Sequence, residues 1–335
     1  MEGFIDFIGM FIGQLQSPTL AFLIAGMIIA ALNSQLRIPD AIYQFCVFML
    51  LMRIGLNAGI GIREANIVDM LLPIVFCIIL GIGIVLLGSI TLARLPGIRK
   101  DDALATAGLF GAVSGSTLMA GMMALEDEGV FYEAWVPALY PFMDTPALVT
   151  AIILANLYLN KGKNGTGTKV AIWPIIKESL QGMAVTALLL GVALGLFTRP
   201  EGVFEEFYDP LFRGFLTILM LVLGMDAYMR LKELTKVAQW YIAYAIIGPV
   251  VHGFIGFGLG YIAHLLIGFS PGGVILLAVI AASNSDISGP PTLRAGIPTA
   301  NPSAYIGPST GVGTPVAIGI CIPLFLALGK VVFDF

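Results

Sequence analysis

The sequence predicts an all-α polytopic membrane protein of about ten transmembrane helices, arranged as two inverted repeats of five helices each. Of its 335 residues, 58% are hydrophobic and 11% are charged, whereas an average soluble domain has roughly 45–50% apolar and about 25% charged residues. Apolar runs recur along the whole chain, and short polar motifs recur in the same order in its two halves. The composition predicts a membrane setting, and the recurrence predicts the repeat.

Ten hydrophobic runs approach the roughly 20 residues that a helix needs to cross a bilayer. They cover approximately residues 18–32, 41–60, 70–92, 103–125 and 134–159 in the first half, and 180–197, 211–227, 237–267, 274–295 and 304–328 in the second. The first five-helix repeat is therefore assigned to residues 1–159 and the second to residues 179–335. Residues 160–178 are expected to form a hydrophilic cytoplasmic linker.

Three pairs of motifs support the duplication. Gly55-Leu56-Asn57-Ala58 resembles Gly224-Met225-Asp226-Ala227, Ser114-Gly115-Ser116-Thr117 resembles Ser288-Gly289-Pro290-Pro291-Thr292, and Thr145-Pro146-Ala147 resembles Thr314-Pro315-Val316, with offsets of 169, 174 and 169 residues. Because five is an odd number, the second repeat enters the membrane from the opposite side, which brings the fourth and ninth helices together near the midplane. Both helices are predicted to be interrupted, since glycine, proline and hydroxyl residues cluster within them.

Positive charge predicts the orientation, because Lys and Arg concentrate in cytoplasmic connections. With the N-terminus outside, the majority of the 17 basic residues fall on or beside the inner side, among them Arg37, Arg94, Arg99, Lys100, Lys161, Lys177, Arg230 and Arg294. We therefore expect both termini to face outward.

A helix that restarts after a break presents N–H groups without intrahelical partners and a positive dipole end, a combination that favours a small anion. The candidate anion-binding residues are Ser114, Gly115, Ser116 and Thr117 at the first break, and Ser288, Gly289 and Thr292 at the second. Their hydroxyls suit an oxyanion that carries its own proton. Close helix packing through small residues is the alternative explanation.

Asp286 lies inside a polar run at residues 283–288, where an uncompensated intramembrane carboxylate costs roughly 2.5–3.5 kcal/mol. A dehydrated sodium ion would compensate it, coordinated by the carboxylate, nearby hydroxyls and carbonyls of the broken helix. The candidate sodium ligands are Asp286, Ser283, Ser285 and Asp144, and no transition metal is expected. A proton relay or an ion pair with Arg294 would also neutralise Asp286.

Coupled transport is the favoured function class. Bringing one negative charge into a cell costs roughly 2.3 kcal/mol per 100 mV, and a sodium ion that travels with it cancels the charge movement. A passive channel is less well supported, and so is an intramembrane aspartyl protease, because the Gly-x-Gly-Asp context is absent around Asp226. No nucleophile–base pair, phosphate loop or metal-ligand cluster indicates an enzyme or a cofactor, and nothing indicates nucleic acid as a partner.

Four strings, QLQSPTLAFLI at 14–24, LFGAVSGST at 109–117, ALYPFMD at 138–144 and SDISGPPTLRAGIP at 285–298, closely resemble the cyanobacterial sodium-dependent bicarbonate transporter family. The resemblance implies sodium-coupled symport of bicarbonate into the cytoplasm for inorganic carbon accumulation in a carbon-concentrating mechanism. It also implies a homotrimer in the plasma membrane, surrounded by membrane lipid, with core and gate domains that are each assembled from both repeats. The fourth and ninth helices then cross in the core domain, whose elevator-like movement would give alternating access.

The resemblance further implies inhibition by a PII-like regulatory protein that senses adenine nucleotides and docks from the cytoplasmic side. Residues 160–168 form a shorter hydrophilic segment than the insertion that family members often carry, which weakens the expectation of regulation through this loop. A sodium symporter for another small carboxylate or inorganic anion is the alternative within the same class.

Overall fold

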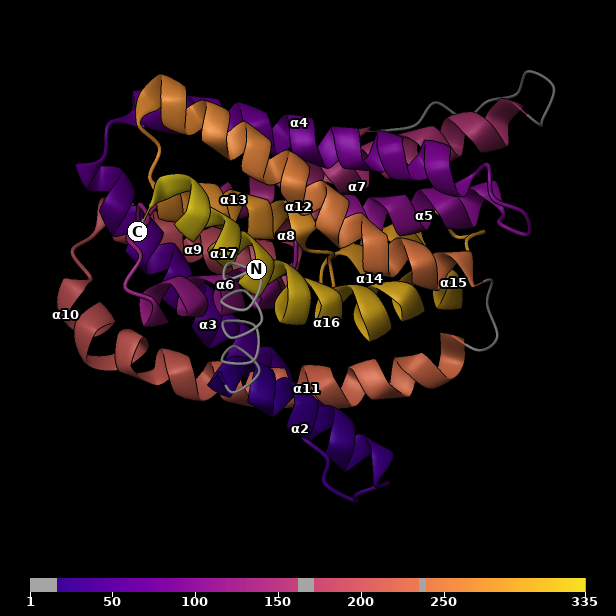
Figure 1. Ribbon diagram of the computed structural model, residues 1–335, viewed down its shortest axis with the longest axis horizontal. Helices are drawn as coiled ribbons and strands as arrows, with labels where there is room; N and C mark the ends of the chain where they lie inside the picture. Colours follow the sequence, from indigo (N-terminus) through magenta and orange to yellow (C-terminus); the bar gives the residue numbers. More distant parts are fainter. Residues whose placement is uncertain (1–16, 162–171, 235–238, 335) are drawn as a thin grey trace.

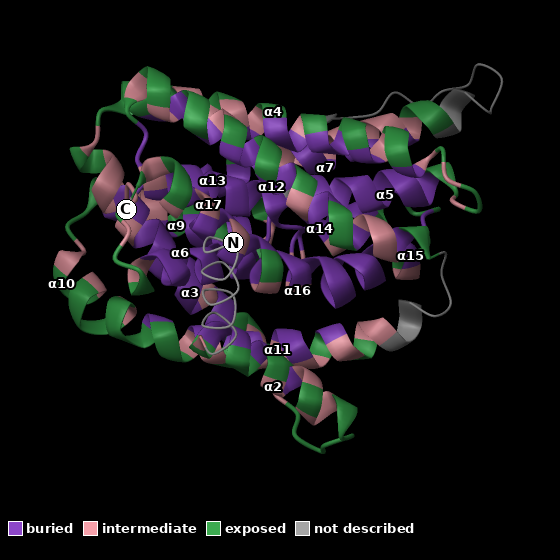
Figure 2. Cartoon of the chain, in the orientation of Figure 1, coloured by how far each residue is buried: buried purple, intermediate pink, exposed green. Residues whose placement is uncertain are grey.

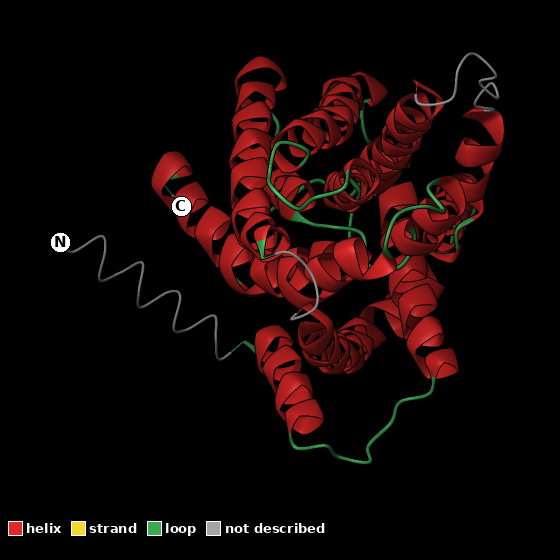
Figure 3. Cartoon of the chain, turned by 90° about the vertical axis from the view of Figure 1, so that its right-hand side faces the viewer, coloured by secondary structure: helices red, strands yellow, loops and turns green. Residues whose placement is uncertain are grey.

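The computed structural model describes residues 17–161, 172–234 and 239–334, and within these residues the chain forms helices and no strands (Figure 1, Figure 3). The all-α prediction is confirmed for this part of the chain. Seven helical stretches in it are long and apolar enough to cross a membrane: Asp40–Glu64, Ile67–Leu92, Lys100–Asp127, Val136–Tyr158, Glu201–Leu231, Trp240–Ile267 and Pro302–Phe333. Each coincides with one of the ten hydrophobic runs, and three shorter apolar helices coincide with the others: Pro18–Ala31, Met183–Phe197 and Pro271–Ala282.

The first half begins with three helices whose ends follow local sequence signals. They are α2 (Pro18–Ala31), α3 (Asp40–Glu64) and α4 (Ile67–Leu92). The side chain of Ser17 caps α2 by accepting from Leu20 N, and Pro18 occupies the first helical position, where its missing N–H leaves no donor unsatisfied. Asn66 caps α4 in the same way by accepting from Val68 N at 3.2 Å.

Two short non-helical segments, called the two breaks below, each separate a pair of interior helices. Residues 112–114 separate α5 (Lys100–Gly111) from α6 (Gly115–Asp127), and residues 283–288 separate α13 (Pro271–Ala282) from α14 (Gly289–Gly296). In Figure 2, α5, α6 and α13 are buried along almost their whole length, whereas α2 and α4 alternate buried and exposed residues. The breaks therefore lie in the interior of the protein.

The remaining helices surround these broken pairs. In chain order they are η1 (Val136–Leu139), α7 (Tyr140–Lys161), α8 (Ile172–Gln181), α9 (Met183–Phe197), α10 (Glu201–Val203), η2 (Phe204–Tyr208), α11 (Asp209–Leu234) and α12 (Trp240–Ile267). The last stretch is continuous and consists of α15 (Pro302–Pro308), η3 (Ser309–Gly313), α16 (Thr314–Val316), η4 (Ala317–Cys321) and α17 (Ile322–Phe333). Two of its segments, η3 and η4, are π-helical turns, which are rare and frequently occur at functional sites.

Two helix pairs are held at close range by glycines. A Cβ at Gly55 of α3 would lie 2.3 Å from the carbonyl oxygen of Leu188 in α9, and Gly59 meets the next turn of α9 in the same way. In the second pair, a Cβ at Gly224 of α11 would lie 1.9 Å from the carbonyl oxygen of Leu23 in α2. Gly55 and Gly224 open one of the repeated motifs, so this motif places glycine where two backbones cross.

Two helices reach into the ends of the predicted linker at 160–178. Helix α7 continues to Lys161, and α8 begins at Ile172. Residues 162–171 of the predicted linker lie outside the described residues. Helix α8 packs against α7 and α14, and this tertiary contact explains why a segment read as a hydrophilic connection ends in a helix.

Candidate functional site

The two helix breaks meet in the interior of the protein. The backbone N–H of Ser114 donates to Ser283 Oγ at 3.1 Å, and the N–H of Ser285 donates to the carbonyl of Leu109 at 2.9 Å. Ser114, Ser283 and Ser285 are fully buried. Segments about 170 residues apart in the chain therefore satisfy each other's freed backbone groups, as polar backbone at membrane depth must.

Asp286 is joined to the first break by a chain of hydroxyls. Ser116 Oγ donates to Asp286 Oδ2 at 2.7 Å and lies 2.7 Å from Ser114 Oγ, which in turn accepts from Thr117 N at 3.1 Å. Asp286 is partly buried, and none of the ion pairs found in the described segments involves it. Arg294 is exposed and makes no ion pair with Asp286 there. The carboxylate is therefore hydrogen-bonded by a hydroxyl but is not compensated by a basic side chain.

Asp144 belongs to a second carboxylate cluster at the breaks. Its Oδ1 accepts from Val113 N at 3.0 Å, and its Oδ2 accepts from Ser288 Oγ at 3.4 Å. Ser288 Oγ also lies 3.1 Å from Ser285 Oγ and 3.3 Å from Tyr140 OH. Asp144 is fully buried. The oxygen atoms around the breaks belong to carboxylates, hydroxyls and carbonyls. Hard cations take such oxygen atoms as ligands.

Several groups at the helix starts are already hydrogen-bonded. Thr117 N donates to Ser114 Oγ, and Gly289 N donates to Ser285 Oγ at 2.8 Å. Thr292 Oγ1 donates back to the carbonyl of Ser288 at 2.8 Å. By contrast, Thr117 Oγ1 is buried without a partner among the described residues. A small anion at this position would find the Thr117 hydroxyl ready to donate, together with the helix-start amides of Gly115 and Ser116.

Sequence reasoning missed the side chains that hold the second break against the last helix. Asn284 Nδ2 donates to the carbonyl of Ser309 at 3.1 Å, to Ser309 Oγ at 2.7 Å and to Thr314 Oγ1 at 2.9 Å. All three side chains are buried. Two signals pointed to them: Asn284 belongs to the polar run, and Thr314 to the repeated Thr-Pro motif. Ser309 had no such signal; it lies at the start of a π-helical turn, and its carbonyl accepts from both Thr314 N and Asn284 Nδ2.

The structure also contains a vestibule of about 930 Å³. It lies between α2, α3 and α11, and its lining includes Arg37, Asp40, Tyr43 and Asp226. Its polar lining therefore includes one basic side chain, two carboxylates and a phenol.

Arg53 has a defined structural place on α3. Its Nε and Nη2 donate to Asp209 Oδ1 at 3.0 and 2.5 Å, and Nη2 lies 3.5 Å from Glu126 Oε1. The guanidinium also lies 4.3 Å from the ring centroid of Phe212, within range of a cation–π interaction. Arg53 thus joins α3 to α11 and to the C-terminal end of α6.

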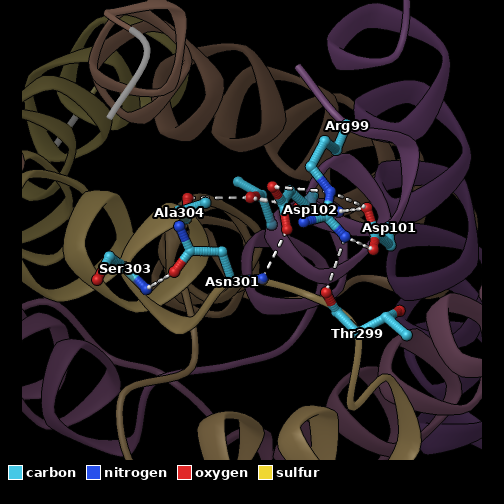
Figure 4. Close-up of polar contacts among 8 residues, drawn as sticks. Arg99, Asp101, Asp102, Thr299, Asn301, Ser303 and Ala304 are labelled. Atoms are coloured by element: carbon cyan, nitrogen blue, oxygen red, sulfur yellow. Dashed lines mark hydrogen bonds and ion pairs between the residues drawn. The ribbon is translucent and has the colours of Figure 1, made fainter. Parts of the chain in front are cut away.

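A second polar cluster joins the two halves of the chain where α5 begins (Figure 4). Arg99 Nη2 donates to Asp101 Oδ2 at 2.5 Å and to the carbonyl of Thr299 at 3.0 Å. Asp102 Oδ1 accepts from Asn301 N at 2.6 Å, and both aspartates are buried. The cluster fixes the start of α5, and hence the first break, relative to the segment between α14 and α15.

A sequence profile of the Na⁺-dependent bicarbonate transporter superfamily matches residues 18–330. The chain belongs to this superfamily. No curated protein matches the chain. Membership implies Na⁺-dependent bicarbonate transport by a membrane protein, and it confirms the resemblance drawn from the sequence.

Proposed function

We propose that this superfamily member is a sodium-coupled symporter that carries bicarbonate into the cytoplasm for inorganic carbon accumulation. The observation that carries the proposal is the meeting of the two helix breaks, which brings Asp286, serine hydroxyls and helix-start amides into one buried site. An ion pair with Arg294 is absent from the described contacts, which favours a bound cation as the group that compensates Asp286. Family membership supplies the chemical identities of the two ions.

The sodium ion is proposed to bind Asp286, Ser283, Ser285 and Asp144. Both carboxylates meet the break at residues 283–288: Asp286 belongs to it, and Asp144 accepts from Ser288, whose Oγ lies 3.1 Å from Ser285 Oγ. Burial of a carboxylate without a counter-charge is costly, and neither carboxylate has a basic partner in the described segments. A sodium ion that completes its coordination with these oxygens would remove that cost.

Bicarbonate is proposed to bind beside sodium, at the helix starts. Its candidate ligands are Ser114, Gly115, Ser116, Thr117, Ser288, Gly289 and Thr292. Gly115 and Ser116 open α6, and Thr117 offers a buried hydroxyl without a partner. The hydroxyls of Ser288 and Thr292 can accept or donate, which suits an anion with one protonated and two unprotonated oxygens. Gly289 N contributes only if Ser285 Oγ releases it.

The proposed architecture is two inverted five-helix repeats with the fourth and ninth helices interrupted. Helix α3 packs on α9 and α2 packs on α11, and each pair crosses at a glycine of the repeated Gly55 and Gly224 motifs. In the numbering of the ten predicted helices, the second packs on the sixth and the first packs on the seventh. Each of these helices therefore packs on a helix of the other repeat, as expected for two intertwined repeats. We propose that α2, α3, α9 and α11 form a gate domain and that the broken helices belong to a core domain.

Alternating access is proposed to be elevator-like, with the core domain moving against the gate domain. The vestibule beside Tyr43 and Asp226 is the proposed cytoplasmic path, in agreement with a plasma-membrane orientation that places both termini outward. A homotrimer and a PII-like adenine-nucleotide-sensing regulator on the cytoplasmic side are proposed on the basis of the family resemblance.

Uptake of labelled bicarbonate into proteoliposomes tests the proposal. We expect saturable uptake that requires an inward sodium gradient. Unlabelled bicarbonate should inhibit this uptake more strongly than other small carboxylates or inorganic anions do. Uptake that persists at the same rate in potassium alone would refute sodium coupling. Stronger competition by another anion would favour the alternative substrate.

A further inference from the structure

A groove of about 480 Å³ lies where α4 ends, α5 begins and α7 approaches its end. Its walls include the apolar side chains of Leu86, Ile90 and Leu154, and Leu86 and Ile90 are 41% and 50% exposed. Helices α4 and α7 both belong to stretches of membrane-crossing length. The groove therefore runs from the apolar face of α4 to the level at which these helices leave the bilayer.

Two basic side chains, Arg94 and Lys100, line the polar end of this groove and are exposed. Lys100 Nζ lies 4.8 Å from the ring centroid of Tyr158, which holds the ammonium at the mouth of the groove. Neither Arg94 nor Lys100 forms an ion pair within the described residues. The adjacent Arg99 differs, because Asp101 and the carbonyl of Thr299 occupy its guanidinium. The groove thus combines apolar walls with two positive charges without a carboxylate partner among the described residues.

We propose that this groove binds one anionic phospholipid, with its phosphate between Arg94 and Lys100 and an acyl chain along Leu86 and Ile90. Basic pockets between membrane helices at the cytoplasmic interface bind anionic head groups. The apolar walls favour a lipid over free phosphate, since an inorganic ion would leave Leu86, Ile90 and Leu154 uncovered. The charge favours an anionic lipid over a zwitterionic one. In the proposed orientation, this lipid belongs to the cytoplasmic leaflet.

Lipid binding is measurable without transport, so its failure is distinguishable from a failure of the proposed function. The purified protein would be exchanged into nanodiscs of phosphatidylcholine that contain a small fraction of phosphatidylglycerol, and retained lipid would be counted by native mass spectrometry after release. We expect phosphatidylglycerol to be retained in preference to phosphatidylcholine. Each neutralising variant, Arg94→Gln and Lys100→Gln, should weaken this retention about fivefold, and the double variant about thirtyfold.

Lys177→Gln is the matched control, because Lys177 is an exposed lysine on α8, which packs against α7, and it does not line the groove. This variant should retain phosphatidylglycerol as the unmodified chain does, and all variants should keep the same melting temperature. Equal retention of phosphatidylcholine would overturn the proposal. So would unchanged retention in the double variant, a loss in Lys177→Gln as large as in Lys100→Gln, or displacement of the lipid by millimolar inorganic phosphate.

Discussion

Asn284 is the side chain whose removal should most directly loosen the second break from the last helix. Its amide has two hydrogens, which serve three acceptors on Ser309 and Thr314 at 2.7–3.1 Å in a fully buried position. Two buried hydrogen bonds contribute about 1 kcal/mol each, and the hydroxyl acceptors left without the amide add about 1 kcal/mol, whereas the Ser309 carbonyl still accepts from Thr314 N. Removal of the buried Asn284 Oδ1, which has no partner among the described residues, offsets part of this loss. We therefore expect Asn284→Ala to lower the free energy of unfolding by about 2 kcal/mol.

The assay is reversible unfolding in mixed micelles with increasing SDS, followed by intrinsic tryptophan fluorescence. Asn57→Ala is the matched control, because Asn57 is a partly buried asparagine of α3 for which no hydrogen bond is found in the described segments. It should change the free energy by less than about 0.5 kcal/mol. A change of less than about 0.5 kcal/mol in Asn284→Ala as well would refute the role assigned to the amide.

Two further perturbations test the helix crossings and the cluster at the start of α5. Gly55→Ala should cost about 1–3 kcal/mol, because the new Cβ would lie 2.3 Å from the carbonyl oxygen of Leu188. A Cβ at Gly214 would meet no atom within 4 Å, so Gly214→Ala should raise the free energy of unfolding by about 0.5–1 kcal/mol. If SDS titrations showed that the free energy of unfolding changes in the same direction in both variants, the close helix crossing at Gly55 would be contradicted. Asp102→Ala should cost about 1.5–3 kcal/mol, because it removes the carboxylate that accepts from Asn301 N at 2.6 Å. Asp102→Asn keeps an acceptor and should lose less than half as much, so equal thermal shifts for the two would argue against this hydrogen bond.

Hydropathy located the helices well, because the length and apolarity of a run are local properties. The breaks are less local. Glycine, proline and hydroxyl residues predict an interruption within the run at 274–295, but they do not fix its ends: one helix ends at Ala282 and the next begins at Gly289. The backbone freed between them is satisfied by Leu109 from the other half of the chain. The π-helical turns of the last stretch have no comparable signature in composition.

In the candidate site, the sequence shows which residue types are present but not which residues contact one another. An intramembrane carboxylate and clustered serines are visible in sequence, and the structure places Ser116 beside Asp286 and Ser283 beside Ser114. The hydrogen-bond partner of each of these side chains is not visible in the sequence. Asp144 contacts Ser288 and Val113 and makes no hydrogen bond to Asp286 in the described contacts, so the two carboxylates form separate clusters. Such choices depend on how helices from different repeats cross, which no single segment encodes.

Sodium-dependent uptake of labelled bicarbonate by the Asp286→Ala variant tests the central claim most directly. Reconstituted protein would be compared with this variant and with Asp69→Asn, which neutralises an exposed carboxylate in the first turn of α4. We predict that sodium-dependent uptake is lost in Asp286→Ala and is retained in Asp69→Asn, with all three proteins folded by their SDS unfolding profiles. Undiminished sodium-dependent uptake by folded Asp286→Ala would contradict the assignment of Asp286 as a sodium ligand.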